Sequence, residues 1–151
     1  MKPELEPVFT AFVTVGAVLD AGPTAAGRRR IIPITGGRVE GPRLTAAVLP
    51  GGADWQVILA DGTAQLIARY TLKTADGTLI SVVNRGVRRG PPEVLARLAA
   101  GAAVDPSEYY FRATPTFEVA DGRHGWLCRS VFLAVGERAP EHVVIRVFEV
   151  T

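Results

Sequence analysis

The sequence has a single cysteine, Cys128, in 151 residues. An intrachain disulfide is therefore excluded, the fold must be stabilised by its core, and a reducing cytoplasm is the expected compartment. Only two histidines are present, and together with the cysteine they lack the paired spacing of zinc ligands. We therefore expect neither a metal site nor a cofactor.

Long hydrophobic runs are also missing. No apolar stretch approaches the roughly 20 residues that a membrane-spanning helix needs. Residues 1–22 lack the basic start and the continuous apolar segment of a secretion signal, and Glu4 and Glu6 argue against one. These absences predict a soluble, cytoplasmic protein with no membrane partner.

A strong excess of charge of either sign is absent as well. Lys and Arg number 17 against 15 Asp and Glu, which gives a formal net charge of +2. The arginine clusters at residues 28–30 and 85–89 have no aromatic residues beside them on which bases would stack. We expect these arginines at solvated strand ends and loops, and we expect no nucleic-acid partner.

Strand patterns and turn signals, in contrast, are abundant. The chain has 16 glycines and 11 prolines, and Asp61-Gly62 and Asp76-Gly77 are typical of tight turns between paired strands. Residues 23–28 are expected to form a loop. The expected strands are residues 8–19, 29–35, 44–49, 55–59, 64–73, 79–85, 109–119, 126–135 and 143–150.

One short helix is expected at residues 91–101. Two prolines suit its first turn, Glu93 and Arg97 are spaced i, i+4, and Gly101 offers a C-terminal stop. We expect its apolar side to cap one end of the fold through Val94, Leu95 and Leu98.

These elements predict an all-β protein with a single domain over residues 1–151. The expected architecture is a closed or nearly closed antiparallel β-barrel of about 8–9 strands with one short helix. Charged residues among apolar ones on barrel strands indicate a partly polar lumen that holds a small molecule. Residues 8–19 and 143–150 are apolar on both strand faces, which predicts a homo-oligomer.

Several blocks of the sequence resemble an uncharacterised bacterial and fungal family. The most specific block is LPGGADWQ at residues 49–56, and the others are RIIPITGG (30–37), GPRL (41–44), ARY (68–70), NRG (84–86), YFR (110–112), PTFE (115–118) and WL (126–127). On these blocks the chain is identified as a member of the domain-of-unknown-function family 3237, the UPF0311 type. The resemblance spans nearly the whole chain and implies a compact barrel, similar to the calycin or allene-oxide-cyclase type and often oligomeric, with no settled activity.

Two positions depart from the pattern of that family. Where similar proteins often have Leu-Asp-Ala-Arg-Tyr, this chain has Ile67 in place of the acid. Where they often have Trp-Leu-Asn, it has Cys128 in place of the amide. If either position is catalytic in the relatives, the resemblance implies a different activity for this chain.

Alternation along two strands separates polar from apolar side chains. On residues 64–73 Arg69 lies on the polar face and Tyr70 on the apolar one, and on residues 109–118 the polar face carries Arg112 and Glu118. The simplest interpretation turns the polar faces to water. Because the resemblance marks Arg112 and Glu118, the alternative is that these residues line a barrel mouth.

In a barrel mouth these residues would form a catalytic site. Glu118, with Asp54 as a second acid, would serve as general base or acid with a raised pKa. Arg112 and Arg69 would hold an anionic group through the fork of the guanidinium. The remaining substrate-binding candidates are an amide and three aromatic walls: Asn84, Trp55, Tyr70 and Trp126. The competing interpretation makes these charges structural salt bridges.

For the other candidate residues a structural role is the simpler interpretation. Cys128, expected in a strand, is typical of a small packed side chain rather than a nucleophile. Gly36-Gly37 and Gly51-Gly52 are expected in turns and lead into no helix, so they do not indicate a phosphate-binding loop.

Three functions are compatible with these residues. The first is a cofactor-independent acid/base enzyme of the isomerase, cyclase or lyase type, acting on a small carbonyl or aromatic anionic compound. The second is a non-catalytic binding protein for an apolar or aromatic small molecule. The third is a structural or accessory subunit whose lumen is filled by its own side chains. The residues favour the enzyme by a small margin.

Overall fold

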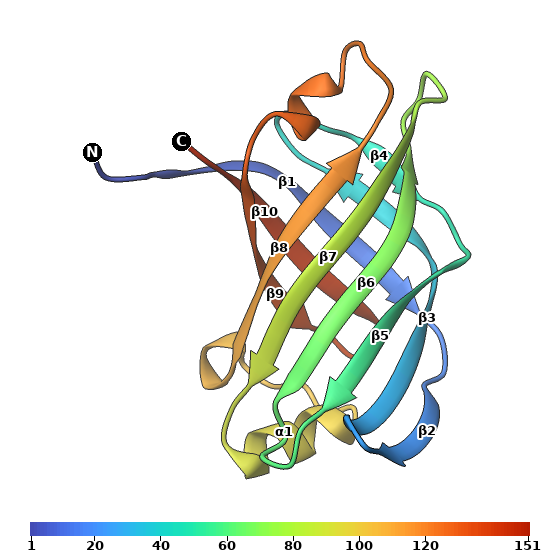
Figure 1. Ribbon diagram of the computed structural model, residues 1–151, viewed down its shortest axis with the longest axis vertical. Coiled ribbons are helices and arrows are strands. Elements are labelled where there is room, and N and C mark those ends of the chain that lie inside the picture. Colours follow the sequence, from blue (N-terminus) through green and yellow to red (C-terminus); the bar gives the residue numbers. More distant parts are fainter.

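Ten antiparallel strands form one sheet that closes on itself in the computed structural model, which describes residues 1–151 (Figure 1). The helices are α1 (Pro92–Ala99) and the 3-10 turns η1 (Pro106–Glu108) and η2 (Gly125–Cys128). The strands are β1 (Leu5–Val15), β2 (Leu19–Thr24), β3 (Gly27–Glu40), β4 (Ala46–Val48), β5 (Gly52–Ile58), β6 (Ala64–Lys73), β7 (Leu79–Arg89), β8 (Tyr110–Glu118), β9 (Phe132–Arg138) and β10 (His142–Val150).

Eight of these strands make the barrel wall. Their order is β1-β10-β9-β8-β7-β6-β5-β3, and the pairing of β1 with β3 closes the ring. The two extra strands extend it: β2 pairs with the first part of β3, and β4 bridges β3 and β6 beyond the end of β5. The predicted all-β antiparallel barrel with one short helix is confirmed.

The longest strand, β3, bends where it changes neighbours. Thr14 of β1 pairs with Gly36, but Val15 pairs with Ile34, so Thr35 is an extra residue that forms a β-bulge. Gly37 follows in a left-handed conformation, with φ at +135°. The Gly36-Gly37 pair, expected in a turn, therefore lies inside a strand and helps the barrel to close.

Two local expectations are wrong. The segment expected as a loop at residues 23–28 is a hairpin in which Thr24 ends β2 and Gly27 begins β3, and Thr24 Oγ1 donates to the Gly27 carbonyl over 2.7 Å. The strand expected at residues 126–135 begins only at Phe132, because the preceding residues form η2. That turn buries Leu127 and leaves Cys128 exposed, so Cys128 is neither in a strand nor packed.

The two ends of the barrel are covered differently. At one end η2 packs its Trp126 ring edge-on against Phe132, which contacts Phe117, and Phe9 completes the aromatic cluster. At the other end α1 lies across the opening (Figure 1) and buries Val94 and Leu98. The helix therefore covers a barrel end as its apolar spacing predicts.

Both chain termini leave the barrel together as a two-stranded ribbon (Figure 1). The start of β1 pairs with the end of β10, and Glu4 and Thr151 exchange two backbone hydrogen bonds of 3.0 and 2.9 Å. No helix in the structure has the length and hydropathy required to cross a membrane.

Candidate functional site

The lumen of the barrel is not filled by side chains. Inward positions at mid-height carry small residues, among them Ala68, Gly86 and Ala113, on three neighbouring strands. They leave a cavity with about 50 Å³ of space for the centres of water-sized molecules, part of it open to solvent, and 11 of its 17 lining residues are hydrophobic. A mostly apolar cavity with a few polar groups is the usual form of a small-molecule site.

Besides two arginines, four polar side chains from three adjacent strands face this cavity. Asp54 and Gln56 alternate on β5, Tyr70 is on β6 and Asn84 on β7. Asp54 pairs with Ala68, which pairs with Asn84, so the acid and the amide flank a methyl group in one row across the sheet. The small side chain of Ala68 keeps the space between them open.

The hydrogen bonds of these groups are incomplete. Gln56 Nε2 donates to Asp54 Oδ2 over 2.8 Å. Asp54 Oδ1, Gln56 Oε1 and Asn84 Oδ1 are shielded from solvent and have no partner within the protein. Buried polar atoms are rarely left unpaired, because each one costs the free energy of its lost hydration. The three oxygens are therefore available to accept hydrogen bonds from a molecule in the cavity.

Burial determines the ionisation of the two acidic groups. Loss of hydration raises the pKa of Asp54, and the Gln56 amide together with the charge of Arg88 opposes that rise only in part. Tyr70, which is 8% exposed, has a pKa raised by burial and then by the charge of Asp54. Asp54 is thus a stronger base than an ordinary aspartate, and Tyr70 keeps its proton at neutral pH.

The raised pKa of Asp54 predicts a specific pH dependence of stability. Well below pH 3.8 the Asp54 carboxyl is protonated in both the folded and the unfolded protein. As the pH rises, Asp54 ionises first in the unfolded chain, because its pKa is lower there. The folded state therefore loses stability until the pH passes the pKa that Asp54 has in the folded protein. Asp54→Asn removes this loss. We expect the variant to melt roughly 2–4 °C above the wild type at pH 7 and at the same temperature in strong acid. A difference that does not change with pH would contradict the shift.

Arginines occupy the end of the cavity nearest α1. Arg88 of β7 and Arg138 of β9 line the lumen, and with Arg30 of β3 they also line a second cavity beneath α1. Burial, and then the charges of Arg138 and Arg30, lower the pKa of Arg88 to about 10. None of these three residues was identified as a site residue from the sequence.

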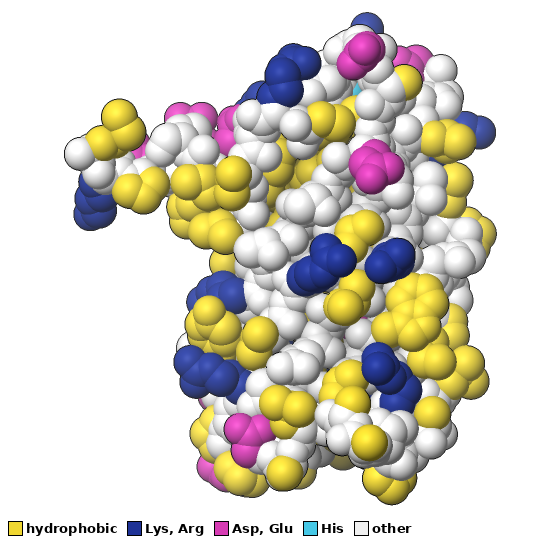
Figure 2. Space-filling model, in the orientation of Figure 1, with side chains coloured by type: hydrophobic (Ala, Val, Ile, Leu, Met, Phe, Trp, Pro, Cys, Tyr) yellow, Lys and Arg dark blue, Asp and Glu magenta, His cyan; other side chains and the backbone are white.

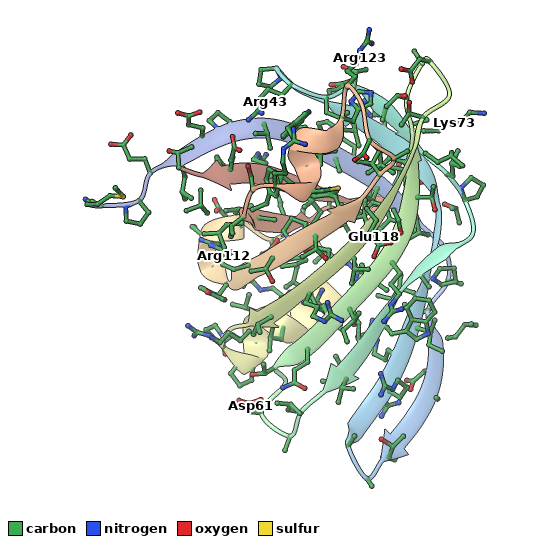
Figure 3. All side chains as sticks on the ribbon, turned by 45° about the horizontal axis from the view of Figure 1, so that its top comes forward. Arg43, Asp61, Lys73, Arg112, Glu118 and Arg123 are labelled. Atoms are coloured by element: carbon green, nitrogen blue, oxygen red, sulfur yellow. The ribbon has the colours of Figure 1, made fainter.

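Glu118, Arg112 and Arg69 do not line the lumen. On β8 the inward residues are Phe111, Ala113, Pro115 and Phe117, and the exposed residues alternate with them. Figure 3 shows Arg112 and Glu118 near opposite ends of β8, six residues apart, which is roughly 20 Å along a strand. The placement of Glu118, Arg112 and Arg69 in a barrel mouth is therefore wrong, because the polar faces of β6 and β8 point to water.

The two tryptophans also lie outside the cavity. Trp55 is on the outer face of β5 and 37% exposed. Trp126 is half-buried at the opposite barrel end, where the Arg43 guanidinium lies 3.9 Å from the centre of its ring. Arg43 also pairs with Glu149, so Trp126 belongs to a structural cluster. Of the eight candidate residues, the structure brings together Asp54, Tyr70 and Asn84.

Alternation along the strands carried the signal for the missed residues. Asp54 and Gln56 are two apart on β5, and Asn84 and Arg88 are four apart on β7, so each pair shares a face. Arg69 is adjacent to Tyr70 and must point the other way. Taking Asp54 and Asn84 as inward would have selected Gln56 and Arg88, and taking Tyr70 as inward would have excluded Arg69.

Comparison with known proteins gives the family. Residues 3–150 match the family described as "Protein of unknown function (DUF3237)". The chain belongs to this family. The UPF0311 protein blr7842 of Bradyrhizobium diazoefficiens is 44% identical over 152 residues, which cover 99% of both chains. Membership confirms the resemblance inferred from the LPGGADWQ block.

Solved structures of other proteins have the same barrel. A conserved protein of unknown function, RPA1785 from Rhodopseudomonas palustris, superposes with a TM-score of 0.97 at 40% identity, over 100% of this chain and 99% of that one. A β-barrel-like protein from Acinetobacter baumannii superposes with a TM-score of 0.87 at 39% identity, over 100% and 98%. An enzyme from Penicillium herquei shares the fold at 21% identity, with a TM-score of 0.74 over 100% and 96%.

The two positions at which the sequence resemblance implies a departure from the family lie away from the lumen. Ile67 is on the outer face of β6, 38% exposed, next to inward Ala68. Cys128 is at the end of η2, where its thiol lies 3.5 Å from the Phe117 carbonyl. An aspartate or an asparagine at these positions would not reach the cavity, so the departures leave the polar group around Asp54 unchanged.

Proposed function

We propose that this protein is a cofactor-independent acid/base enzyme of the isomerase, cyclase or lyase type, and that the barrel lumen is its active site. The observation that carries the proposal is Asp54, a carboxylate with raised pKa and one unpartnered oxygen in a mostly apolar cavity. A base of this kind is suited to remove a proton from carbon next to a carbonyl group. The substrate class is a small carbonyl compound.

The neighbouring groups fit the charge that such a reaction develops. When Asp54 takes the proton, the electron pair of the broken C–H bond moves into the carbonyl and leaves a negative charge on its oxygen. Tyr70 is protonated, and Asn84 carries two amide N–H groups on the same wall, so both are donors for that oxygen. Return of the proton to another atom, ring closure or loss of a leaving group would then give the product class.

Proton exchange tests the proposal without knowledge of the final product. The protein is incubated in D₂O with a panel of small ketones whose α-protons exchange slowly alone, and loss of the α-proton signal is followed by NMR. Catalysed exchange on at least one compound is expected. Binding of these compounds without any acceleration of exchange would contradict the enzyme.

The second candidate is a binding protein for an apolar or aromatic small molecule. The apolar majority of the lining residues favours it, since such a wall stabilises a bound ring without chemistry. The two candidate functions differ in the role of Asp54. The enzyme needs the ionised carboxylate as a base, whereas a binding protein does not. A structural subunit with a filled lumen has less support, because the cavity between β5 and β9 is open.

A homo-oligomer is part of the proposal, with a second copy of this chain covering an apolar outer patch. The patch consists of two rows of residues paired across β9, β10 and β1: Val131, Val150 and Leu5, and Leu133, Phe148 and Pro7. Figure 2 shows hydrophobic side chains on and below the projecting ribbon to which these rows belong. Leu5 and Val131 are 52% and 67% exposed, which is costly for a lone chain but suits a self-complementary interface.

We expect multi-angle light scattering to give at least twice the chain mass for the wild type and the mass of one chain for the double variant Leu5→Glu, Leu133→Glu. Ile67→Glu, which places one glutamate at another exposed apolar site, is the control and should leave the assembly intact. A wild type of single-chain mass would contradict the oligomer.

The cytoplasmic location expected from the sequence stays a prediction, to be checked by fractionating the host cells.

A further inference from the structure

The three inward arginines lack the partners that buried cations normally have. The five ion pairs of the structure involve other arginines, and no side-chain hydrogen bond of Arg30, Arg88 or Arg138 is present. Arg88 is only 8% exposed, and the nearest aromatic contact of its guanidinium is the Phe111 ring at 5.9 Å. A buried guanidinium without an anion is strongly unfavourable.

Like charges make the cluster more costly still. The positive charge of Arg30 lowers the pKa of both Arg88 and Arg138. Asp54 is the one carboxylate whose negative charge raises the pKa of both. Asp54 is not within ion-pair distance of either, and its Oδ2 is already bonded to Gln56. Three positive charges therefore face one negative charge, and the deficit falls at the end of the lumen beneath α1.

We propose that Arg30, Arg88 and Arg138 bind the oxyanion head group of the substrate, so the enzyme acts on organic anions whose apolar body lies in the lumen. Guanidinium groups from three strands can hold a carboxylate or phosphate in several two-pronged contacts. This inference deepens the proposed function and rests on it, since it takes the lumen as the active site.

The geometry sets where the rest of the molecule lies. Arg88 and Asn84 are four residues apart on β7, roughly 13 Å along the strand. Gly86 lies between them on the inward face and leaves the space free of a side chain. A head group at the arginines therefore places a ring-sized body along Gly86 and Ala113, with its far side at the level of Asp54 and Asn84.

The position of α1 gives this site a cover. The cavity between the arginines and the helix is lined on the helix side by Leu95, Leu98 and two alanines. An apolar cover reduces the access of water to a head group bound beneath it and so strengthens its contacts with the arginines, since charge–charge attraction rises as solvent is excluded. Benzoate and phenyl phosphate are simple probes that match the head group and the body.

Thermal shift and calorimetric titration with these probes test the inference. At constant ionic strength, benzoate, phenyl phosphate or both should raise the melting temperature of the wild type, and the one that does so identifies the head group. Benzamide, which has the same ring without the charge, should have little effect. Arg88→Met and Arg138→Met should each weaken binding about 10- to 100-fold, while the outer-face control Arg112→Met should bind as the wild type does.

The unliganded variants give a second readout. Because Arg88→Met replaces an unpaired buried charge with an apolar chain of similar length, we expect it to melt at or above the temperature of the unliganded wild type. Equal affinity of Arg88→Met and wild type for the anions, or equal effects of benzamide and benzoate, would overturn the inference.

Asp54→Asn separates this inference from the proposed function. The variant retains the arginines and should bind the anionic probes at least as tightly as the wild type, because a negative charge has been removed from the cavity. Anion binding that requires Arg88, without any dependence of proton exchange on Asp54, would leave the anion site standing and contradict the enzyme. Exchange that requires Asp54 without anion binding would contradict the anion site alone.

Discussion

Replacing Asp54 by asparagine is expected to slow catalysed proton exchange by about 10²–10⁴-fold, the usual contribution of a general base. The asparagine side chain has the same shape and keeps a carbonyl oxygen to accept from Gln56 Nε2, which lies 2.8 Å from Asp54 Oδ2 in the wild type. The barrel should therefore stay folded, and the loss should appear in kcat with little change in ligand affinity. The NMR exchange assay in D₂O measures it directly.

Glu118→Gln is the matched control for this loss. It makes the same carboxylate-to-amide change, but on the outer face of β8, where the side chain is exposed and faces away from the cavity. We expect its exchange rate to equal that of the wild type. A large loss in Glu118→Gln together with normal exchange in Asp54→Asn would assign the chemistry to the outer surface and contradict a site in the lumen.

Gly37→Ala is expected to cause a large loss of stability. A Cβ atom at this position would lie 2.1 Å from the Phe12 carbonyl oxygen and 3.1 Å from Val13 Cα, all of it backbone that cannot rotate away. The contact falls on the β1–β3 pairing that closes the ring. We expect the free energy of unfolding to fall by about 3 kcal/mol or more, and the melting temperature by roughly 10 °C.

Gly51→Ala separates the steric part of this effect from the conformational part. Gly51 also has a positive φ, +108°, but a Cβ there meets nothing within 4 Å. The variant should lose only the cost of the backbone conformation, about 1–3 kcal/mol. Equal melting temperatures for the two variants would mean that β1 and β3 move apart without cost, and that closure contributes little to stability.

The barrel could be predicted from the sequence because its signals are local. Asp61-Gly62 joins β5 to β6, and the alternation of residues 64–73 gives β6 with its observed bounds. The 126–135 strand was mispredicted because Trp126 and Leu127 have the composition of a strand while their packing over the aromatic end of the lumen requires a 3-10 turn. That requirement comes from residues distant in the sequence.

The candidate site was only half predictable for a similar reason. Asp54 and Asn84 attract attention because they are polar residues within apolar strands. Arg88 does not, because it sits beside Arg89 in what a single sequence presents as a solvated basic cluster. Which of the two arginines points into the lumen depends on which face of β7 is turned towards the barrel axis. In the structure Arg88 is 8% exposed, whereas Arg89 is exposed.

The seam between β8 and β9 has a consequence for how the lumen exchanges its contents. Only Arg112–Val135 and Ala113–Ala134 pair there, whereas β7 and β8 pair along nine residues. A Tyr109 hydroxyl that accepts from the Arg138 amide over 2.9 Å takes the place of further backbone bonds. Breathing motions of a closed ring concentrate where the fewest hydrogen bonds must break. Ala113 belongs both to this short ladder and to the wall of the lumen. We therefore expect small molecules to enter and leave through transient separation of β8 and β9, without displacement of α1.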